Sequence, residues 1–441
     1  MLKTNLTKLF LILSLIFIVS LSGCNMINDD YYEDNIYQGK VTIDGFSEEN
    51  NASELKLLLE GDKITPRKVE DFKIQNGEII ANLANLKGEV FITPVCNGYT
   101  FSPSSEKVNS SNNEVNFTAH FNNNEIKNRV MTFYYPWYRT ENYSGRWFHW
   151  EKVDKENKEI GNSTNYPELG PYDSTNPEVV ETHLKQAKEV GIDTLILSWW
   201  GPGSPSDNAV DLILDKALEY DISITLYYEE NQKETSQDRI DKGVEDFKYI
   251  LEEYTYHPAY LRVNGNPVLF TYIRVMDQVS KNEWRDIFET VKNDKGEEFE
   301  IISGELTEES ASLFDGFHRY NYAAQMESLI DEGNSADEIE DIKRNEFEGW
   351  IKDLGDPYDI ISALTVTPGY DDTKIREPGI VVPRKKGDIY KALWNAAIDA
   401  DPDWILITSF NEWHEGTEIE PSFEYGEKYL KITKEKINEF K

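Results

Sequence analysis

The chain has 441 residues and a formal net charge of -36, because 81 acidic residues oppose 45 basic ones. This length allows one large domain and a smaller one, and this charge argues against nucleic acid as a partner, since phosphates bind basic faces. Aromatic residues make up 12% of the chain. That content suits a carbohydrate ligand, because rings stack on the apolar faces of sugars, although large cores also use aromatic residues.

Residue types that bind metals are sparse. The six histidines are scattered and neither an HxxxH nor a CxxC spacing occurs, so we predict no cofactor and no metal site of histidine and cysteine. The many carboxylates leave a calcium site open. The two cysteines are Cys24 and Cys96. Because Cys24 falls within the export signal described next, no intrachain disulfide is expected.

The first residues have the features of an export signal. Two lysines precede an apolar run over residues 9–21, which is too short to span a membrane and predicts a secretory signal peptide over residues 1–23. The run ends in Leu-Ser-Gly-Cys, which resembles a bacterial lipobox. We therefore expect lipid on Cys24 to anchor the protein at the extracytoplasmic face of the cell membrane. The alternative is an ordinary signal peptide with a coincidental cysteine.

Residues 24–38 are polar and acidic, which predicts a disordered tether between the lipid and the first domain. Residues 39–124 then show short alternating runs separated by turn residues, as is typical of a small β-sandwich. These runs lie at residues 40–43, 54–59, 78–83, 89–94 and 114–120. Residues 99–105 and 115–119 resemble the closing strands of prealbumin-like or fibronectin-like accessory domains. Such a domain is a spacer or a weak sugar binder, and the Asn-rich residues 121–127 follow it as a linker.

Residues 128–441 alternate between apolar runs and helical patterns. The apolar runs lie at residues 130–135, 194–198, 223–228, 268–272, 299–302, 314–319, 360–366 and 404–409. The helical patterns lie at residues 177–190, 209–220, 241–253, 281–292, 337–353, 387–400 and 424–440. Eight strands with helical crossovers predict an α/β fold, a (β/α)8 TIM barrel. The alternative is an open doubly wound sheet, but no GxGxxG or Walker pattern follows the first run, so a nucleotide site has no support.

The loop after the eighth run holds two carboxylates three residues apart, Glu412 and Glu415. Barrel enzymes place their chemistry in loops at the carboxyl ends of strands, so this pair is a candidate general acid and base. We expect Trp413 and His414 to exclude water and to raise the pKa of one carboxylate. The competing interpretation is that these glutamates are solvated loop residues of a very acidic chain.

Residues 408–420 read Thr-Ser-Phe-Asn-Glu-Trp-His-Glu-Gly-Thr-Glu-Ile-Glu, which resembles the signature of glycoside hydrolase family 99. This family contains the endo-α-1,2-mannosidases and endo-α-1,2-mannanases. Further motifs that resemble the family follow in its order between residues 130 and 422. They lie at residues 134–138, 149–150, 166–174, 198–203, 315–322 and 368–376.

The resemblance implies a retaining, endo-acting hydrolase of α-1,2-linked mannosides, with carbohydrate as its partner. In this family one carboxylate deprotonates the 2-hydroxyl of the substrate, which attacks the anomeric carbon and gives a 1,2-anhydro sugar. By position, Glu412 is that base, and Glu415 is the acid that protonates the leaving oxygen and later activates water. The substrate-binding residues that the resemblance and the ring-rich loops indicate are Tyr135, His149, Trp200, Glu229, Tyr320, Tyr370, Asn411 and Trp413.

Two loops depart from the family pattern. Around Glu229 the chain reads Tyr-Tyr-Glu-Glu-Asn, where the family has HIEPY followed by a glycine and an arginine. Only the carboxylate is matched, and it remains a candidate for stabilising positive charge near the anomeric carbon. After Arg376, Glu-Pro-Gly stands where the family has Pro-Trp-Asn. For Arg376, a structural ion pair with Asp371 or Asp372 is as good an interpretation as contact with the substrate. For His149, a structural role is likewise an alternative to substrate binding.

Two other functions compete with hydrolysis of mannosides. A surface-anchored lipoprotein that captures glycans without cleaving them would use the same lipid signal and the same rings. An α-glucan-active barrel would explain the two loop departures as marks of a different substrate. A panel of α-mannans and α-glucans, read by product chromatography, separates these functions.

Overall fold

The computed structural model describes residues 36–46, 55–75, 78–96, 99–121 and 127–441. The predicted signal peptide, Cys24 and the tether up to residue 35 lie outside these residues, as does most of the predicted linker. Among the described residues, none of the helices combines the length and the apolar character that crossing a membrane requires.

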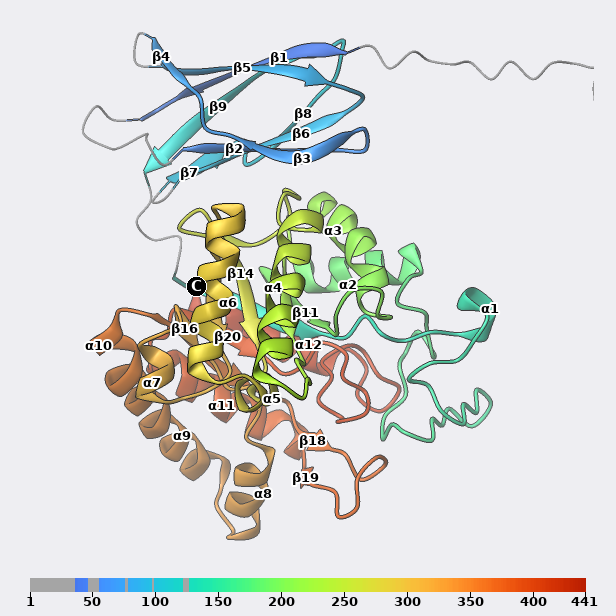
Figure 1. The fold of residues 1–441 in the computed structure, drawn as a ribbon. Helices are drawn as coiled ribbons and strands as arrows, with labels where there is room; N and C mark the ends of the chain where they lie inside the picture. The colour runs from blue at the N-terminus through green and yellow to red at the C-terminus, as the bar shows by residue number, and fades with distance from the viewer. Residues whose placement is uncertain (1–35, 47–54, 76–77, 97–98, 122–126) are drawn as a thin grey trace, which may run out of the picture. The chain divides into compact units, whose positions relative to one another are not determined.

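Residues 36–121 form two β-sheets around a shared apolar core (Figure 1). The strands are β1 (Tyr37–Asp44), β2 (Lys56–Gly61), β3 (Ile64–Val69), β4 (Lys73–Gln75), β5 (Glu78–Leu86), β6 (Val90–Val95), β7 (Tyr99–Ser102), β8 (Glu106–Val108) and β9 (Glu114–Phe121). One sheet has the order β4-β5-β1-β9-β7 and the other the order β3-β2-β6-β8. Alternate residues such as Val41 and Ile43 of β1 and Leu57 and Leu59 of β2 are buried in one cluster, as in a β-sandwich.

Eight parallel strands close into a barrel in the rest of the chain, which confirms the predicted TIM fold. They are β10 (Arg129–Tyr134), β11 (Thr194–Trp199), β12 (Ser223–Tyr228), β14 (Asn266–Thr271), β15 (Glu300–Ser303), β16 (Gly316–Phe317), β17 (Ile361–Val366) and β20 (Trp404–Ile407). The pairing of β10 with β20 and of β12 with β14 completes the circle. All six residues of β11 and of β17 are buried, as expected of strands covered on both faces.

Helices and short strands connect the barrel strands. The helices are α1 (Glu141–Ser144), α2 (Pro177–Val190), α3 (Val210–Glu219), α4 (Ser236–Glu253), α5 (Ile273–Gln278), α6 (Lys281–Lys295), α7 (Glu308–Ala311), α8 (Ala323–Asp331), α9 (Ala336–Trp350), α10 (Asp356–Tyr358), α11 (Asp388–Asp399) and α12 (Lys428–Phe440). The short strands are β13 (Arg262–Val263), β18 (Tyr370–Asp371) and β19 (Val381–Val382). Local chemistry sets helix ends: the Asn176 side chain accepts the Glu178 amide at the start of α2, and Gly191 ends that helix with φ 91°.

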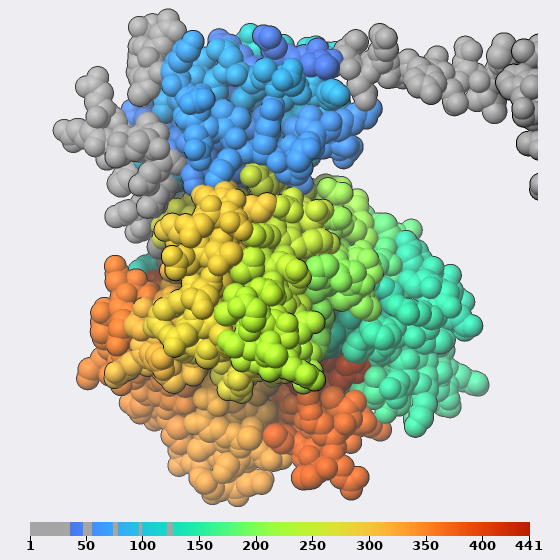
Figure 2. All heavy atoms as spheres, in the orientation of Figure 1, coloured from blue at the N-terminus to red at the C-terminus, as the bar shows by residue number. Residues whose placement is uncertain are grey.

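Two apolar layers surround the barrel strands. One layer packs the outer faces of the strands against the helices, and α3, α4 and α6 cover the face seen in Figure 2. The second layer fills the barrel and includes Phe133, Phe270 and Leu406. This inner layer continues into rings of the loops at the carboxyl end, among them Tyr138 and Trp413. The candidate site therefore rests on the packed interior of the barrel.

Candidate active site

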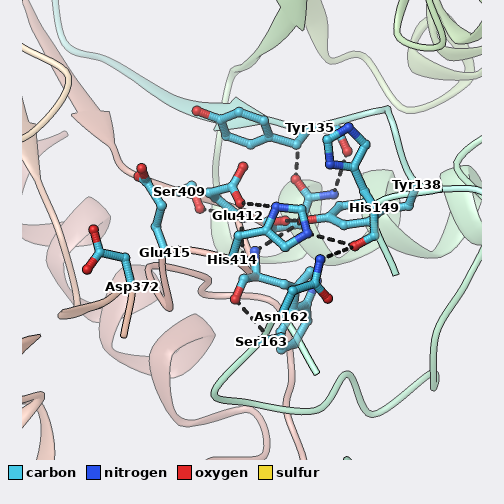
Figure 3. Close-up of polar contacts among 12 residues, drawn as sticks. Tyr135, Tyr138, His149, Asn162, Ser163, Asp372, Ser409, Glu412, His414 and Glu415 are labelled. Atoms are coloured by element: carbon cyan, nitrogen blue, oxygen red, sulfur yellow. Dashed lines mark hydrogen bonds and ion pairs between the residues drawn. The ribbon is translucent and has the colours of Figure 1, made fainter. Parts of the chain in front are cut away.

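The loop after β20 folds back on itself and presents two carboxylates side by side (Figure 3). The Ser409 hydroxyl accepts the Glu412 amide at 2.7 Å and lies 2.8 Å from the Thr417 hydroxyl. The Ser409 amide also donates to the Thr417 carbonyl at 2.9 Å. These bonds tie the start of the loop to its end, and so Glu412 and Glu415 are both held in one cavity.

The cavity has a volume of about 300 Å³ and lies where the barrel strands end. Its lining consists mostly of rings and charged side chains: Tyr135, Trp137, His149, Trp200, Tyr227, Glu229, Tyr272, Arg274, Tyr320, Ile375, Arg376, Glu412, His414 and Glu415. Mostly aromatic walls with a few converging polar groups are typical of a small-molecule site, and rings of this kind suit the apolar faces of sugars.

Glu412 is buried, and its contacts with His414 are all made through one carboxylate oxygen. Its Oε1 accepts the His414 amide at 3.0 Å and lies 3.2 Å from His414 Nδ1. Among the described residues no donor contacts Oε2. Because Glu412 also lines the cavity, Oε2 is the oxygen that is free to accept a proton from a bound ligand.

Glu415 meets a different set of groups. Burial and then the neighbouring Glu412 carboxylate raise its pKa to about 7, while Arg376 acts in the opposite direction. Arg376 Nη1 lies 3.2 Å from Oε1, and the Tyr320 hydroxyl donates to Oε2 at 3.3 Å. The Tyr135 hydroxyl in turn donates to that of Tyr320 at 2.7 Å. A carboxyl group with a pKa near 7 is suited to donate a proton at neutral pH.

Glu229 follows β12 and also lines the cavity. The Ser198 hydroxyl donates to its Oε1 at 2.7 Å, and Trp200 Nε1 donates to that same hydroxyl at 2.9 Å. Arg274 Nη2 lies 3.7 Å from Oε2. Burial is the main reason that the pKa of Glu229 is raised to about 8. Ser198 and Arg274 thus hold this carboxylate in a loop that lacks the histidine, proline and tyrosine of the family pattern.

Trp200 lines the cavity as predicted, but Arg274 occupies one face of its ring. The Arg274 guanidinium lies 5.0 Å from the Trp200 ring centroid and 5.1 Å from that of Tyr272. Both separations are within the range of a cation–π contact. A sugar stacked on this face of Trp200 would have to displace Arg274, so the predicted stacking contact needs either a movement of Arg274 or the other face of the ring.

His149 belongs to the ring-rich loop after β10. Its ring stacks on Trp137 with centroids 4.2 Å apart and planes 8° from parallel. Burial, with smaller contributions from His414 and Arg139, lowers its pKa to about 3, so the ring is neutral over the physiological range. Its backbone has φ 61°, and its carbonyl accepts hydrogen bonds from Asn162 and from His414 Nε2. His149 therefore contributes both a ring of the lining and a backbone acceptor.

Three of the predicted binding residues lie behind the lining. Asn411 makes two hydrogen bonds with the Tyr135 backbone: its Oδ1 accepts from the Tyr135 amide at 2.7 Å, and its Nδ2 donates to the Tyr135 carbonyl at 3.2 Å. Trp413 is fully buried and donates to the Tyr172 hydroxyl at 3.1 Å. The Tyr370 hydroxyl donates to Asp372 at 3.0 Å and accepts from Arg376. None of the three lines the cavity, and each fixes a residue that does or the loop that carries it.

Five lining residues were not singled out as site residues from the sequence: Trp137, Tyr227, Tyr272, Arg274 and Ile375. Tyr272 and Arg274 directly follow β14, which ends at Thr271, so the rule that sites gather at strand ends could have found them. Nothing in the local pattern distinguishes Ile375 from other loop residues. The residues that the structure describes include no group of three or more histidines, cysteines or carboxylates arranged to hold a metal ion.

Comparisons with known proteins show the family to which the chain belongs. The sequence matches the family described as Glycosyl hydrolase family 99 over residues 125–433. It is 30% identical to the glycoprotein endo-alpha-1,2-mannosidase of Rattus norvegicus over 330 aligned residues. This alignment covers 66% of this chain and 67% of the rat protein. It is 31% identical over 331 residues to the glycoprotein endo-alpha-1,2-mannosidase-like protein of Homo sapiens, which covers 66% and 68%.

A solved structure has the same fold. The GH99 endo-alpha-mannosidase from Bacteroides thetaiotaomicron superposes with a TM-score of 0.59 at 25% identity, covering 71% of this chain and 97% of that one. The family match includes the barrel strands, the ring-rich loop after β10 and the loop with both candidate carboxylates. The chain therefore belongs to glycosyl hydrolase family 99 and is a glycoside hydrolase.

Proposed function

We propose that this hydrolase is a retaining, endo-acting enzyme that cleaves α-1,2-linked mannosides, with Glu412 and Glu415 as its catalytic residues. The observation that carries this proposal is that the two carboxylates line one cavity in unequal surroundings. Glu412 is held by donors on one oxygen, whereas the pKa of Glu415 is raised to about 7. The names of the rat and human relatives support the choice of linkage and sugar.

In the first step Glu412 Oε2 takes the proton of the 2-hydroxyl on the sugar whose glycosidic bond breaks. The freed oxygen attacks the anomeric carbon and forms the three-membered ring of a 1,2-anhydro sugar. The bond from this carbon to the leaving oxygen breaks, and Glu415 gives that oxygen its proton. In an α-mannoside the axial 2-hydroxyl lies trans to the leaving group, which is the geometry that this attack needs.

In the second step Glu415 is a carboxylate and takes a proton from a water molecule. The water oxygen attacks the anomeric carbon and opens the three-membered ring, and the sugar oxygen at position 2 recovers the proton held by Glu412. Two inversions at the anomeric carbon leave its configuration unchanged. Because the attacking hydroxyl has to be free, a preceding sugar in the chain is joined through another position.

The other lining groups support these steps. Arg376 limits how far the pKa of Glu415 rises. Because the pKa of Glu229 is raised to about 8, this side chain is a neutral hydrogen-bonding group of the lining at pH 7, and not the negative charge that was expected near the anomeric carbon. The rings of Tyr135, Trp137 and Trp200 offer apolar faces for a sugar. A neutral sugar also suits a chain with a net charge of -36.

The test is to incubate the purified chain with yeast-type α-mannan and with α-glucans and to identify the products. We expect oligosaccharides from mannan that retain the α configuration and none from glucan. Glu412→Gln and Glu415→Gln should each form the mannan products about 10²- to 10⁴-fold more slowly. Binding of mannan without products would support a glycan-capturing protein, and products from glucan alone would support an α-glucan-active barrel. Either result would overturn the proposal.

We also propose that lipid on Cys24 anchors the enzyme at the extracytoplasmic face of a cell membrane. The support is the pattern of residues 1–24, in which an apolar run ends in Leu-Ser-Gly-Cys. Bacterial cells expressing the chain should incorporate labelled fatty acid and carry the protein in their membrane fraction. Cys24→Ala should remove the label, and a label that persists in this variant would contradict the proposal.

A further inference from the structure

We infer that His414 is held as an imidazolium ion and that it is the positioning residue that keeps Glu412 ionised as a base. The geometry points to this because each nitrogen of the ring faces an oxygen that accepts. Nε2 lies 2.7 Å from the His149 carbonyl oxygen, and Nδ1 lies 3.2 Å from Glu412 Oε1 (Figure 3). The role as a partner of the base rests on the proposed function, whereas the protonation state does not.

The contact at Nε2 fixes one proton. A backbone carbonyl has no proton to donate, so a bond of 2.7 Å to it requires hydrogen on Nε2. This carbonyl is aimed by a backbone with φ 61°, in the left-handed region that residues with a β-carbon rarely adopt. The stack of the His149 ring on Trp137 and the hydrogen bond from Asn162 to the same carbonyl hold that conformation. The acceptor is thus a fixed part of the loop after β10.

The contact at Nδ1 concerns the second proton. If the pair shares one proton, it lies either on Nδ1, giving an ion pair, or on Glu412 Oε1, giving a neutral pair. The same Oε1 also accepts the His414 amide at 3.0 Å. The backbone N–H that donates to this oxygen and the ring nitrogen 3.2 Å from it both favour negative charge on the oxygen, and so the ion pair is favoured. In that state His414 donates from Nε2 to the His149 carbonyl, its positive charge lies beside Glu412 Oε1, and Glu412 Oε2 is left to react.

The charged groups around the pair agree with this assignment. Burial acts to lower the pKa of His414, but the Glu412 carboxylate outweighs it, with help from the His149 carbonyl and Glu415, so the pKa is raised. The titratable groups around the pair come from six loops of the site: Tyr135, Tyr138, His149, Glu229, Arg274, Tyr320, Arg376 and Glu415. Burial raises the pKa of each of these tyrosines far above its usual range and His149 is neutral, so none of these four competes for the charge.

The consequence is a base that stays ionised in acid. An adjacent cation favours the charged form of a carboxylate, so the imidazolium extends the activity of Glu412 to lower pH. Without it, the acidic limb of the pH–rate profile is expected to move toward neutral pH. Glu415 gives the opposite limb, because its proton is lost as the pH rises through about 7.

The direct test is nitrogen NMR of the full chain labelled at its histidines. We expect both His414 ring nitrogens to be protonated at pH 7 in the wild-type chain. In Glu412→Gln, we expect Nδ1 to lose its proton at a lower pH than in the wild-type chain. The signal is assigned by its loss in His414→Gln or, if that variant does not fold, by replacing the other histidines in turn. A bare Nδ1 at pH 7 in the wild-type chain overturns the inference, and this result does not depend on which substrate the enzyme cleaves.

The second test is the pH dependence of kcat/KM for His414→Gln. We expect the acidic limb to move up by about 1 to 2 pH units, so that activity at a fixed acidic pH falls about tenfold for each unit. His120→Gln, an exposed position of β9, is the matched control and should leave the profile unchanged. A uniform loss at every pH, with no movement of the limb, would show that His414 only supports the fold.

Discussion

On one side of the cavity, the loop after β10 and His414 surround Glu412 with donors and rings. On the other side, Arg376 and Tyr320 from the loops after β17 and β16 surround Glu415. The two glutamates are chemically identical and three residues apart, yet different groups contact them, and the pKa of Glu415 is raised to about 7. Their difference comes from groups that distant segments supply, and it separates a base from an acid within one loop.

The largest effects should come from removing either carboxylate. Glu412→Gln and Glu415→Gln are each expected to lower kcat by about 10²- to 10⁴-fold on α-mannan, because each loses one proton transfer. Thermal unfolding should show that both variants fold. A variant with near-normal kcat would remove that residue from the scheme.

A substrate with fluoride as its leaving group sharpens the comparison, since fluoride departs without a proton. Glu415→Gln should regain most of its first-step rate on an α-mannosyl fluoride, whereas Glu412→Gln should not. Release of fluoride is the measurement. Equal recovery in both variants would contradict the division of roles between the two sides.

The next largest effect should come from the buried hydrogen bonds beneath the loop that carries Glu412. Tyr172→Phe removes the hydroxyl that donates to Glu420 at 2.8 Å and accepts from Asn411 and Trp413. We expect about 1–3 kcal/mol of lost stability, because buried polar groups lose their partner. Chemical denaturation measures this loss. Tyr143→Phe changes an exposed tyrosine in the same way and should have no such effect.

Arg376→Gln should mainly change the pH dependence of kcat/KM, because Arg376 contacts the proposed acid Glu415. Arg376 lowers the pKa of Glu415, so its removal should raise that pKa above 7 and keep the acid protonated to higher pH. The alkaline limb of kcat/KM is expected to move up by about 1 pH unit. A limb that stays in place or moves down would show that Glu415 is not the group that sets it.

Glu229 should give the smallest effect, in stability rather than in chemistry. Its pKa is raised from 4.5 to about 8 in the folded protein, so the folded state keeps a proton that the unfolded state loses. The resulting contribution to stability is complete below pH 4.5 and is lost as the pH rises through about 8. Glu229→Gln should therefore lose less stability than wild type between pH 5 and pH 9 in denaturation experiments. Parallel losses would contradict the raised pKa.

Much of the fold could be predicted because it rests on patterns that are local in the sequence. Eight buried apolar runs separated by helical patterns identified the barrel, and even β16, with two residues, was included in a predicted run. In residues 36–121 predicted runs include β1, β2, β5, β6, β7 and β9, but not β3, β4 and β8. Ile64–Val69 of β3 is half-buried along most of its length, so its pattern carries little alternation.

The candidate site was predictable only in part. Glu412 and Glu415 followed from strand-end placement and from the family resemblance, but the direction of a loop side chain depends on distant contacts. Trp413 faces the buried Tyr172 rather than the cavity. Arg274 on the face of Trp200 and the inward carbonyl of His149 depend on groups from separate segments of the chain, and no local pattern encodes them.

The most direct test of the account is a mannoside that lacks the 2-hydroxyl on the sugar whose glycosidic bond would break. Removing this hydroxyl makes the bond intrinsically easier to break, so a loss of cleavage cannot be blamed on a stronger bond. We predict that the 2-deoxy substrate binds and is not cleaved. Cleavage at the normal rate, or a sugar trapped as an ester on Glu412 or Glu415, would contradict the account.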